Sequence, residues 1–189
     1  MQIIYLAAGS SRRFLSQKLL YEFRGRPLYM HGLDALKQLA EMRNDCRIRV
    51  VYREEQIALD NPDIETVYSP DSSLGISYSI RAGLEGVNDD VMFAAADQPG
   101  ITADTLNGFI DAFYSSDKPC GCLAHKGIPG NPAIFRSELL EELQGLQKDT
   151  GGRAVLKKYP CFLYETENAA ELYDIDTLKD AEFYDNDIV

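Results

Sequence analysis

Short apolar runs alternate with amphipathic helical stretches along the whole chain, and this alternation constrains the fold more than any other feature. Apolar residues in short continuous or alternating runs predict strands, whereas apolar residues at i, i+3 and i+4 predict helices. Strands that alternate with helices are typical of a parallel sheet, because parallel neighbours need a long crossover connection. The sequence therefore predicts an α/β fold: a three-layer, Rossmann-like, mostly parallel sheet with helices on both faces.

The expected elements follow one another without a break that would mark a domain boundary. Strands are predicted over 3–7, 47–52, 65–68, 91–95, 120–124, 132–135 and 162–165, and helices over 28–42, 77–84, 103–114, 137–146, 152–157 and 178–184. The glycine-rich segment HKGIPGNP, at 125–132, is predicted to be a loop. Because the 189 residues contain no repeat and no linker-like stretch, we expect one domain over 1–189.

Charge and cysteine content restrict the partners and the compartment. The net charge of -11 disfavours binding to nucleic acid or to an anionic membrane, since both partners would be negative. No apolar run approaches bilayer length, and the apolar amino terminus stops too early for a secretory signal. The four cysteines include no CxxC pair, which favours reduced thiols. We expect a cytoplasmic protein without nucleic-acid or membrane partners.

The loop after the first predicted strand has the composition of a phosphate site. Gly9 lets the backbone approach a ligand, Ser10 and Ser11 add hydroxyl groups, and Arg13 and Lys18 add positive charge. In open α/β sheets, ligands bind at this carboxyl end of the strands. The spacing matches neither GxGxxG nor GxxxxGK[ST]. A surface turn with solvated arginines is the alternative interpretation.

Two acidic positions are candidate ligands for a metal ion. Asp97 ends the apolar run VMFAAA, and Asp176 alternates with Asp174 on an extended stretch, so these last two side chains share a face. Carboxylates at a strand end suit Mg²⁺, which also takes substrate phosphates and water. The alternatives are structural: Asp97 as a turn residue, and Asp176 or Thr177 as the cap of the last helix.

A third candidate segment is the loop and helix start around GISYS. Ser77 and Ser79 lie at the beginning of a predicted helix, where free N–H groups and hydroxyls can bind an anion, a sugar or a base. The spacing is not GxSxG, which argues against a hydrolase nucleophile. A serine that only caps a core helix is the alternative.

These segments together resemble a known family. LAAGSSRRFLSQK, at 6–18, is similar to the signature LAAGxSxRxGxxK of the molybdenum-cofactor nucleotidyltransferases, within the MobA-like NTP transferase family, although Leu15 replaces a glycine. The resemblance implies a fold of the nucleotide-diphospho-sugar transferase type. In the amino-terminal segment it implies nucleotide binding by Leu6, Ala7, Ala8, Gly9, Ser10, Ser11, Arg13 and Lys18.

Five further segments extend the resemblance, in order, along the chain. DQPG resembles the family's DQP/DMP motif and LYDIDTLKD resembles DIDTPEDL, which implies metal binding by Asp97 and Asp176, with Leu178 in place of the usual proline. GISYSIRAGL resembles GMSxSLRxGL, GIPGNPAIF resembles GHPVLF, and KDTGGRAVL resembles GDxGARxLL. The residues implied are Gly75, Ser77, Ser79 and Arg81 for the nucleotide, Gly130, Asn131, Pro132 and Arg153 for the acceptor, and Asp149 and Gly151 beside them.

The resemblance implies a reaction in which an acceptor phosphate attacks the α-phosphorus of an NTP and pyrophosphate leaves. Arg13, Lys18 and Asp97 are the implied catalytic residues, with Mg²⁺ as the cofactor. LAAG, GISYS and GNP favour the cytidylyltransferase (MocA-type) branch, with CTP and molybdopterin as substrates and a molybdenum hydroxylase as recipient.

Three alternatives remain at this point. The chain could transfer a guanylyl group, or act on a sugar phosphate or alcohol phosphate, because one fold serves many acceptors. It could also be a non-catalytic nucleotide-binding module, such as a chaperone that hands over the cofactor. The presence of both Asp97 and Asp176 argues against this last alternative.

Overall fold

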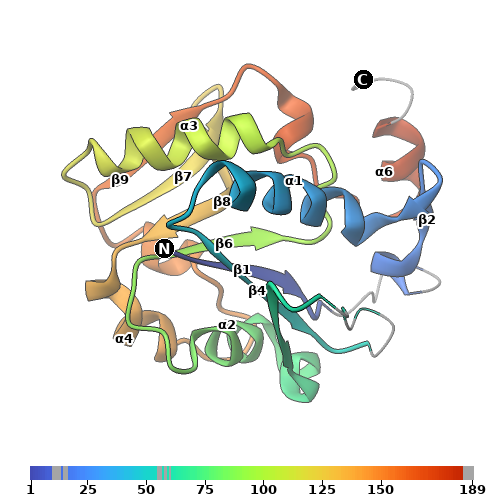
Figure 1. Ribbon diagram of the computed structural model, residues 1–189, viewed down its shortest axis with the longest axis horizontal. Helices are drawn as coiled ribbons and strands as arrows, with labels where there is room; N and C mark the ends of the chain where they lie inside the picture. The colour runs from blue at the N-terminus through green and yellow to red at the C-terminus, as the bar shows by residue number, and fades with distance from the viewer. Residues whose placement is uncertain (10–13, 15–16, 55–56, 58, 60, 185–189) are drawn as a thin grey trace.

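The computed structural model describes residues 1–189 except 10–13, 15–16, 55–56, 58, 60 and 185–189. Its centre is a seven-stranded sheet in the order β5-β4-β1-β6-β8-β7-β9 (Figure 1). The strands are β1 (Gln2–Ala7), β4 (Arg47–Tyr52), β5 (Ile64–Tyr68), β6 (Val91–Ala95), β7 (Cys120–His125), β8 (Ile128–Phe135) and β9 (Cys161–Glu165). Only β8 in this sheet runs antiparallel to its neighbours β6 and β7. The predicted α/β, mostly parallel sheet is confirmed.

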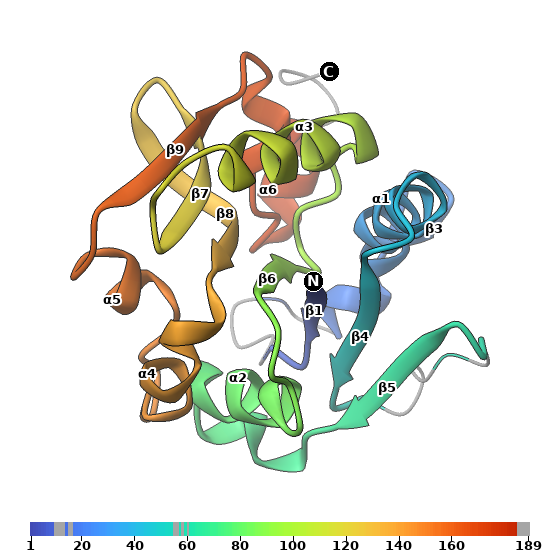
Figure 2. The same ribbon diagram turned by 60° about the vertical axis from the view of Figure 1, so that its left-hand side comes forward.

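Helices cover both faces of this sheet (Figures 1 and 2). One face packs against α1 (Leu28–Met42) and α3 (Ala103–Tyr114), and the other against α2 (Ile76–Leu84), α4 (Leu140–Gln144) and α5 (Arg153–Leu156). The alternation along β1 explains the two layers, since Ile3 and Tyr5 join the core under α1 and α3, whereas Ile4 joins the core under α2. The predicted three-layer arrangement is therefore confirmed.

A third cluster attaches the end of the chain to the segment after β1. Phe23, Ala181 and Tyr184 belong to this cluster, which brings α6 (Leu178–Phe183) against the small hairpin of β2 (Glu22–Phe23) and β3 (Arg26–Pro27). Short 3-10 helices lie at Lys18–Leu20, Pro70–Leu74, Ser137–Leu139 and Ala169–Leu172. No helix in the described part of the chain is long and apolar enough to cross a bilayer.

The glycine-rich segment 125–132 differs from its prediction as a loop. Most of it belongs to β8, which pairs with β7 from His125↔Ile128 onward. The turn itself is only Lys126 and Gly127, both with positive φ (52° and 76°), as a tight two-residue hairpin requires. Glycine and proline are poor strand formers, so the composition of this segment predicted a loop. Backbone pairing with β7 nevertheless makes it a strand. The loop prediction was wrong for 128–131.

Two further segments differ from the sequence prediction: the helix predicted over 137–146, and the hairpin near residue 25. The former is a 3-10 turn, Ser137–Leu139, followed by α4, which ends at Gln144. The latter, β2 and β3, was not predicted, because two-residue strands have no detectable periodicity.

Candidate functional site

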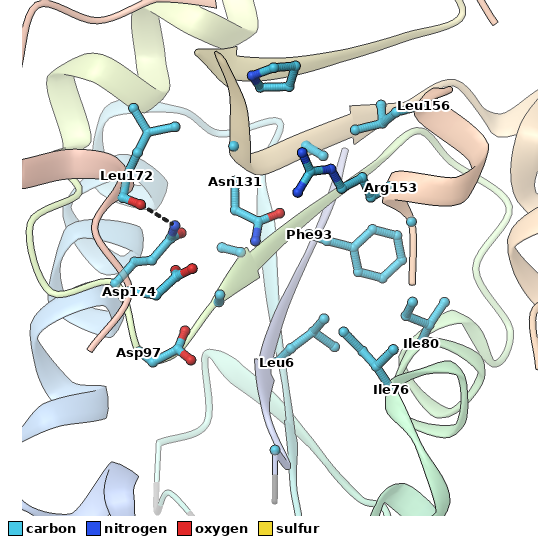
Figure 3. A pocket seen from close by; sticks show the side chains of 18 of the residues that line it. Leu6, Ile76, Ile80, Phe93, Asp97, Asn131, Arg153, Leu156, Leu172 and Asp174 are labelled. Carbon is cyan, nitrogen blue, oxygen red and sulfur yellow. Dashed lines mark hydrogen bonds between the residues drawn. The ribbon is translucent and has the colours of Figure 1, made fainter. Parts of the chain in front are cut away.

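A cavity of about 580 Å³ opens beside the carboxyl ends of β1 and β6. The predicted residues that line it are Leu6, Gly9, Gly75, Ser79, Asp97, Gly130, Asn131, Asp149 and Arg153. They come from segments distributed over most of the chain, and the fold brings them to one cavity. Figure 3 shows acidic side chains on one side of this cavity, apolar side chains on the other, and Asn131 and Arg153 between them.

The acidic side is organised by a single ammonium group. Nζ of Lys18 lies 2.7 Å from Oδ2 of Asp97 and 3.0 Å from Oδ1 of Asp176. Burial disfavours the charged form of Lys18, but attraction to Asp97 and Asp176 outweighs it, so the pKa of Lys18 is raised. Residues 79 and 158 positions apart from Lys18 in sequence therefore form one charged cluster.

The last turn before α6 directs Asp176 into this cluster. The helix cap is Thr177, whose Oγ1 accepts from the Asp180 N–H, while Asp180 Oδ2 accepts from the Thr177 N–H. The side chain of Asp176 is therefore not needed as a cap. The Ile175 N–H donates to the Asp97 carbonyl at 2.9 Å, which holds the two acidic segments together.

Asp174 lies in the wall of the same cavity. Asp174 is exposed, but it lies in a concave wall, and the surrounding protein atoms remove part of the water around its carboxylate. Desolvation, followed by repulsion from Asp97 and Asp176, raises the pKa of Asp174 from its ordinary value of 3.8 to about 6. Three carboxylates thus gather around one lysine.

The opposite wall is apolar. It is lined by Leu6, Ile76, Ile80, Phe93 and Leu156 (Figure 3). The Phe93 ring also makes an edge contact with Phe135, with 6.0 Å between the ring centroids. A wall of this kind suits a planar ring or another weakly polar group, whereas the acidic side suits a cation and phosphates. The cavity is therefore divided chemically in a way that fits a nucleotide-like or ring-bearing phosphate ligand.

The start of α2 approaches the loop before α5 closely. Gly75 has φ +140°, and a Cβ there would lie 2.3 Å from the backbone carbon and oxygen of Lys148. The Ser77 N–H donates to the Lys148 carbonyl, and the Ser77 Oγ is fully buried and has no hydrogen-bond partner among the described atoms. Arg81 donates to the Leu146 carbonyl at 2.6 Å and so joins α2 to the end of α4.

Not every predicted site residue lies in the cavity wall. Of those the structure describes, Ala7, Ala8, Ser77, Pro132 and Gly151 are next to lining residues rather than among them. Lys18 is linked to the cavity by its ion pair with the lining residue Asp97, and Asp176 in turn pairs with Lys18. The remaining predicted residues, Ser10, Ser11 and Arg13, are outside the described part of the chain.

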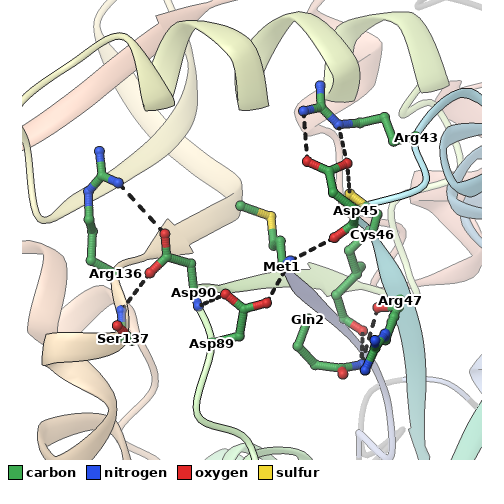
Figure 4. A network of polar contacts seen from close by, with 11 residues as sticks. Met1, Gln2, Arg43, Asp45, Cys46, Arg47, Asp89, Asp90, Arg136 and Ser137 are labelled. Atoms are coloured by element: carbon green, nitrogen blue, oxygen red, sulfur yellow. Dashed lines mark hydrogen bonds and ion pairs between the residues drawn. The ribbon is translucent and has the colours of Figure 1, made fainter.

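The opposite end of the sheet has a different character. There the Met1 amino group contacts the Asp45 carbonyl and the Asp89 carboxylate, and Arg43 pairs with Asp45 (Figure 4). On the same side, Asp90 accepts from the Ser137 N–H. These carboxylates are paired with cations or backbone groups that belong to the fold, which leaves the acidic cluster around Lys18 as the stronger candidate for ligand binding.

The family follows from a match along most of the chain. Residues 3–162 match the model described as the MobA-like NTP transferase domain. The chain belongs to this family. The matched range of this MobA-like protein includes the start of α2, Asp97 and Asn131, whereas the lining residues Leu172 and Asp174 lie beyond it.

Individual relatives agree with this assignment. The chain is 28% identical to the purine catabolism protein PucB of Bacillus subtilis (strain 168), over 92% of this chain and 90% of PucB. It is 24% identical to a probable molybdenum cofactor guanylyltransferase of Pyrococcus horikoshii, over 60% of this chain and 56% of that protein.

A solved structure supports the fold. The crystal structure of Rv0371c from Mycobacterium tuberculosis superposes with a TM-score of 0.80 at 20% identity, covering 96% of this chain and 95% of that one. A complex of the same protein with manganese superposes with a TM-score of 0.74. At this identity the likeness shows a shared fold, which agrees with the fold that the resemblance implied.

The donor set fits a hard divalent cation that is shared with a substrate. Asp97 and Asp176 offer carboxylate oxygens that already converge on one positive nitrogen. In the described part of the chain no group of three or more His, Cys, Asp or Glu residues is arranged to hold a metal by itself. Mg²⁺ characteristically takes one or two carboxylates and completes its coordination with water and phosphate oxygens, so two aspartates suffice.

Some lining residues were not identified from the sequence. Gln98 is buried, lines the cavity and donates to the Leu172 carbonyl at 3.4 Å. Its only signal was its position directly after Asp97. His125 and Phe93 also line the cavity. An apolar residue such as Phe93 has the same strand pattern whether it faces the core or a ligand, so periodicity did not distinguish it.

Proposed function

We propose that this MobA-like protein transfers a nucleoside monophosphate from an NTP to a phosphorylated small molecule and releases pyrophosphate. The observation that carries the proposal is the meeting of Lys18, Asp97 and Asp176 at the acidic side of a 580 Å³ cavity. A triphosphate needs positive charge and a divalent cation close together, and these three side chains supply the groups for both. The family assignment supports the same reaction class.

The bond changes need no protein nucleophile. An oxygen of the acceptor phosphate forms a bond to the α-phosphorus, and the bond from that phosphorus to the pyrophosphate oxygen breaks. Asp97 and Asp176 would hold Mg²⁺, which supplies neutralisation of phosphate charge when bound. Lys18, together with Arg13, would bind the triphosphate and stabilise the departing pyrophosphate. Catalysis then depends on positioning and on fixed charge.

The nucleotide and the acceptor are proposed to occupy different parts of the cavity. Gly9, Gly75 and Ser79 would contact the nucleotide, as their positions in the family motifs suggest. The acceptor would lie against the hairpin residues Gly130 and Asn131, with Pro132 behind them. The guanidinium of Arg153 suits an acceptor phosphate, because it can donate two parallel hydrogen bonds to phosphate oxygens.

Within this class we propose CTP as the donor and molybdopterin as the acceptor, so that the protein is a molybdenum cofactor cytidylyltransferase. The preference for CTP comes from LAAG, GISYS and GNP in the sequence. The acceptor is supported by the resemblance and by the name of the Pyrococcus horikoshii relative, which is described as a probable guanylyltransferase of the same cofactor. A molybdenum hydroxylase is the proposed recipient of the product.

The test is a comparison of donors and acceptors. Purified protein is incubated with molybdopterin, Mg²⁺ and CTP, GTP or ATP in separate reactions, and the product is weighed by mass spectrometry while pyrophosphate is measured. We expect a cytidylylated product and pyrophosphate with CTP. A strong preference for GTP contradicts the cytidylyl assignment. Turnover only with sugar phosphates or alcohol phosphates contradicts the acceptor, and nucleotide binding without any product contradicts the enzyme itself.

A further inference from the structure

Three of the four cysteines meet on one face of the sheet, on the side covered by α4 and α5. Cys120 and Cys122 are two residues apart on β7, so their side chains share a face, and Cys161 begins the neighbouring strand β9. The two strands pair in parallel with Cys120 opposite Cys161. The fourth, Cys46, belongs to the core on the other face of the sheet. The proposed transferase reaction uses none of these thiols.

Two of the clustered sulfur atoms are close enough to react. Sγ of Cys122 lies 3.9 Å from Sγ of Cys161. The Cys120 thiol is instead directed at the Pro160 carbonyl, also at 3.9 Å. A disulfide bond requires sulfur atoms about 2.05 Å apart, so the gap has to close by about 2 Å. Because Cys122 lies diagonally across from Cys161 in the strand register, closure takes a small shift of the β9 backbone as well as rotation of the side chains. Cys122 is therefore the better placed partner for Cys161.

Access and ionisation single out Cys161 as the thiol that reacts first. Cys120 and Cys122 are completely buried, whereas Cys161 is partly exposed. Hydrogen bonding from the Cys120 and Cys122 thiols lowers the pKa of Cys161, and the interaction with Cys161, reinforced by burial, raises the pKa values of the other two. The thiol that two neighbouring thiols can stabilise as a thiolate is thus also the one of these three that an oxidant in solution can reach.

We propose that Cys161 is an oxidation site and that Cys122 is the thiol that resolves it, which gives an intrachain disulfide between β9 and β7. The oxidant is a hydroperoxide. The Cys161 thiolate attacks the peroxide oxygen that carries the hydrogen and breaks the O–O bond; the sulfur keeps the hydroxyl as a sulfenic acid, and the departing hydroxide or alkoxide takes a proton from solvent to leave as water or an alcohol. The Cys122 sulfur then attacks Sγ of Cys161, the S–O bond breaks, and the hydroxyl leaves as water with the proton of the Cys122 thiol.

The pair lies directly behind the cavity wall. A hydrogen bond from the Gly130 N–H reaches the sulfur of Cys122, and Gly130 lines the cavity. Beyond β9 the chain leads to the segment with Asp174 and Asp176. The site therefore takes a small peroxide from outside and forms its cross-link beside the proposed acceptor hairpin. A thiolate metal centre is a less suitable reading, because no group of three or more cysteines or other ligands in the described chain is arranged to hold a metal.

The experiment follows the thiols and does not depend on the transferase activity. Reduced full-length protein is treated with hydrogen peroxide, alkylated and analysed by intact mass and peptide mapping. We expect loss of two hydrogens, retention of two alkylatable thiols, and a linked pair of peptides that contain Cys122 and Cys161. Before oxidation, native protein exposed briefly to iodoacetamide is expected to carry the label first on Cys161.

Alanine variants separate the two roles, and circular dichroism checks that each is folded. Cys161→Ala is expected to form no disulfide, whereas Cys122→Ala is expected to accumulate sulfenic acid on Cys161 that dimedone traps. Cys46→Ala is the matched control and is expected to form the cross-link as the wild type does. Four alkylatable thiols after peroxide treatment of the wild type, or a linked pair other than Cys122 and Cys161, would overturn the proposal even if no variant folds.

Discussion

The ammonium nitrogen of Lys18 lies 2.7 Å from Oδ2 of Asp97, where two acidic segments of the chain converge. The same nitrogen contacts Asp176 at 3.0 Å, so one cation neutralises part of the charge of both carboxylates. In the proposed reaction a divalent cation at Asp97 and Asp176 would need the same oxygen atoms. We therefore expect lysine and metal to compete in the absence of nucleotide, and triphosphate binding to relieve this competition by giving Lys18 another anionic partner.

Lys18→Met is expected to tighten binding of Mn²⁺ to the nucleotide-free protein by about tenfold, because two partly buried carboxylates lose their competing cation. The same variant is expected to lose turnover, since the triphosphate loses a positive partner. Titration of Mn²⁺ followed by electron paramagnetic resonance measures the affinity. Lys37→Met, which removes a cation from an exposed pair with Asp34, is the control. Weaker or unchanged Mn²⁺ binding in Lys18→Met contradicts the competition.

Asp97→Ala is expected to keep the fold and to lose pyrophosphate release by at least about 10²–10³-fold, the loss typical for one preorganised charged contact. The side chain lies at the cavity surface rather than in the core, so the unfolding transition should change little. Asp104→Ala, an exposed substitution in the first turn of α3, is the control for activity. Wild-type turnover by Asp97→Ala refutes the role assigned to this aspartate.

Asp174→Asn is expected to stabilise the metal-free protein at pH 7.5 and to lose this advantage as the pH falls. The pKa of Asp174 is raised to about 6 in the folded protein, so the folded state binds the proton more tightly than the unfolded state does. Stability from this group is present at low pH and is lost as the pH rises through 6. Urea unfolding in EDTA at pH 7.5 and pH 4.5 measures the difference, with exposed Asp63→Asn for comparison. An equal gain at both pH values argues against the assigned cause.

Gly75→Ala is expected to destabilise the protein by about 3 kcal/mol and to weaken nucleotide binding, because its new methyl group meets the Lys148 backbone at 2.3 Å. Gly86→Ala separates backbone strain from this clash, since Gly86 also has positive φ (+72°) but has no atom within 4 Å of an added Cβ. Only the left-handed penalty of about 1 kcal/mol is expected there. Urea unfolding measures both variants. Equal losses of unfolding free energy would show that the backbone at Lys148 shifts to make room for the methyl group.

Glu171→Ala is expected to cost about 3 kcal/mol of unfolding free energy, because three threonine hydroxyls, among them the buried one of Thr166, lose this acceptor. The Glu171 carboxylate is buried and accepts from the hydroxyls of Thr102, Thr105 and Thr166, which fixes the segment that leads to Asp174 and Asp176. Urea unfolding measures the change. Glu167→Ala, an exposed substitution nearby, is expected to change stability by less than about 0.5 kcal/mol.

The sequence by itself determined the local elements and the chemistry of the acidic and basic candidates. The predicted bounds of α1, α3, β4 and β6 agree with the structure, because each has a long, regular apolar pattern that follows from backbone geometry. Lys18, Asp97 and Asp176 were identified as candidates from their charge and their places in the loops around predicted elements, and their roles came from the resemblance to a known family.

Only the tertiary structure decided which of these residues meet. The order of the strands brings Asp97 and Asp176 to one lysine, makes a strand of Ile128–Asn131, and places Cys161 beside Cys122. It also turned the Ser77 side chain into the interior and Phe93 toward the cavity. The physical reason is that periodicity is a property of neighbouring residues, whereas a site depends on contacts between distant segments, and those depend on how the sheet is assembled.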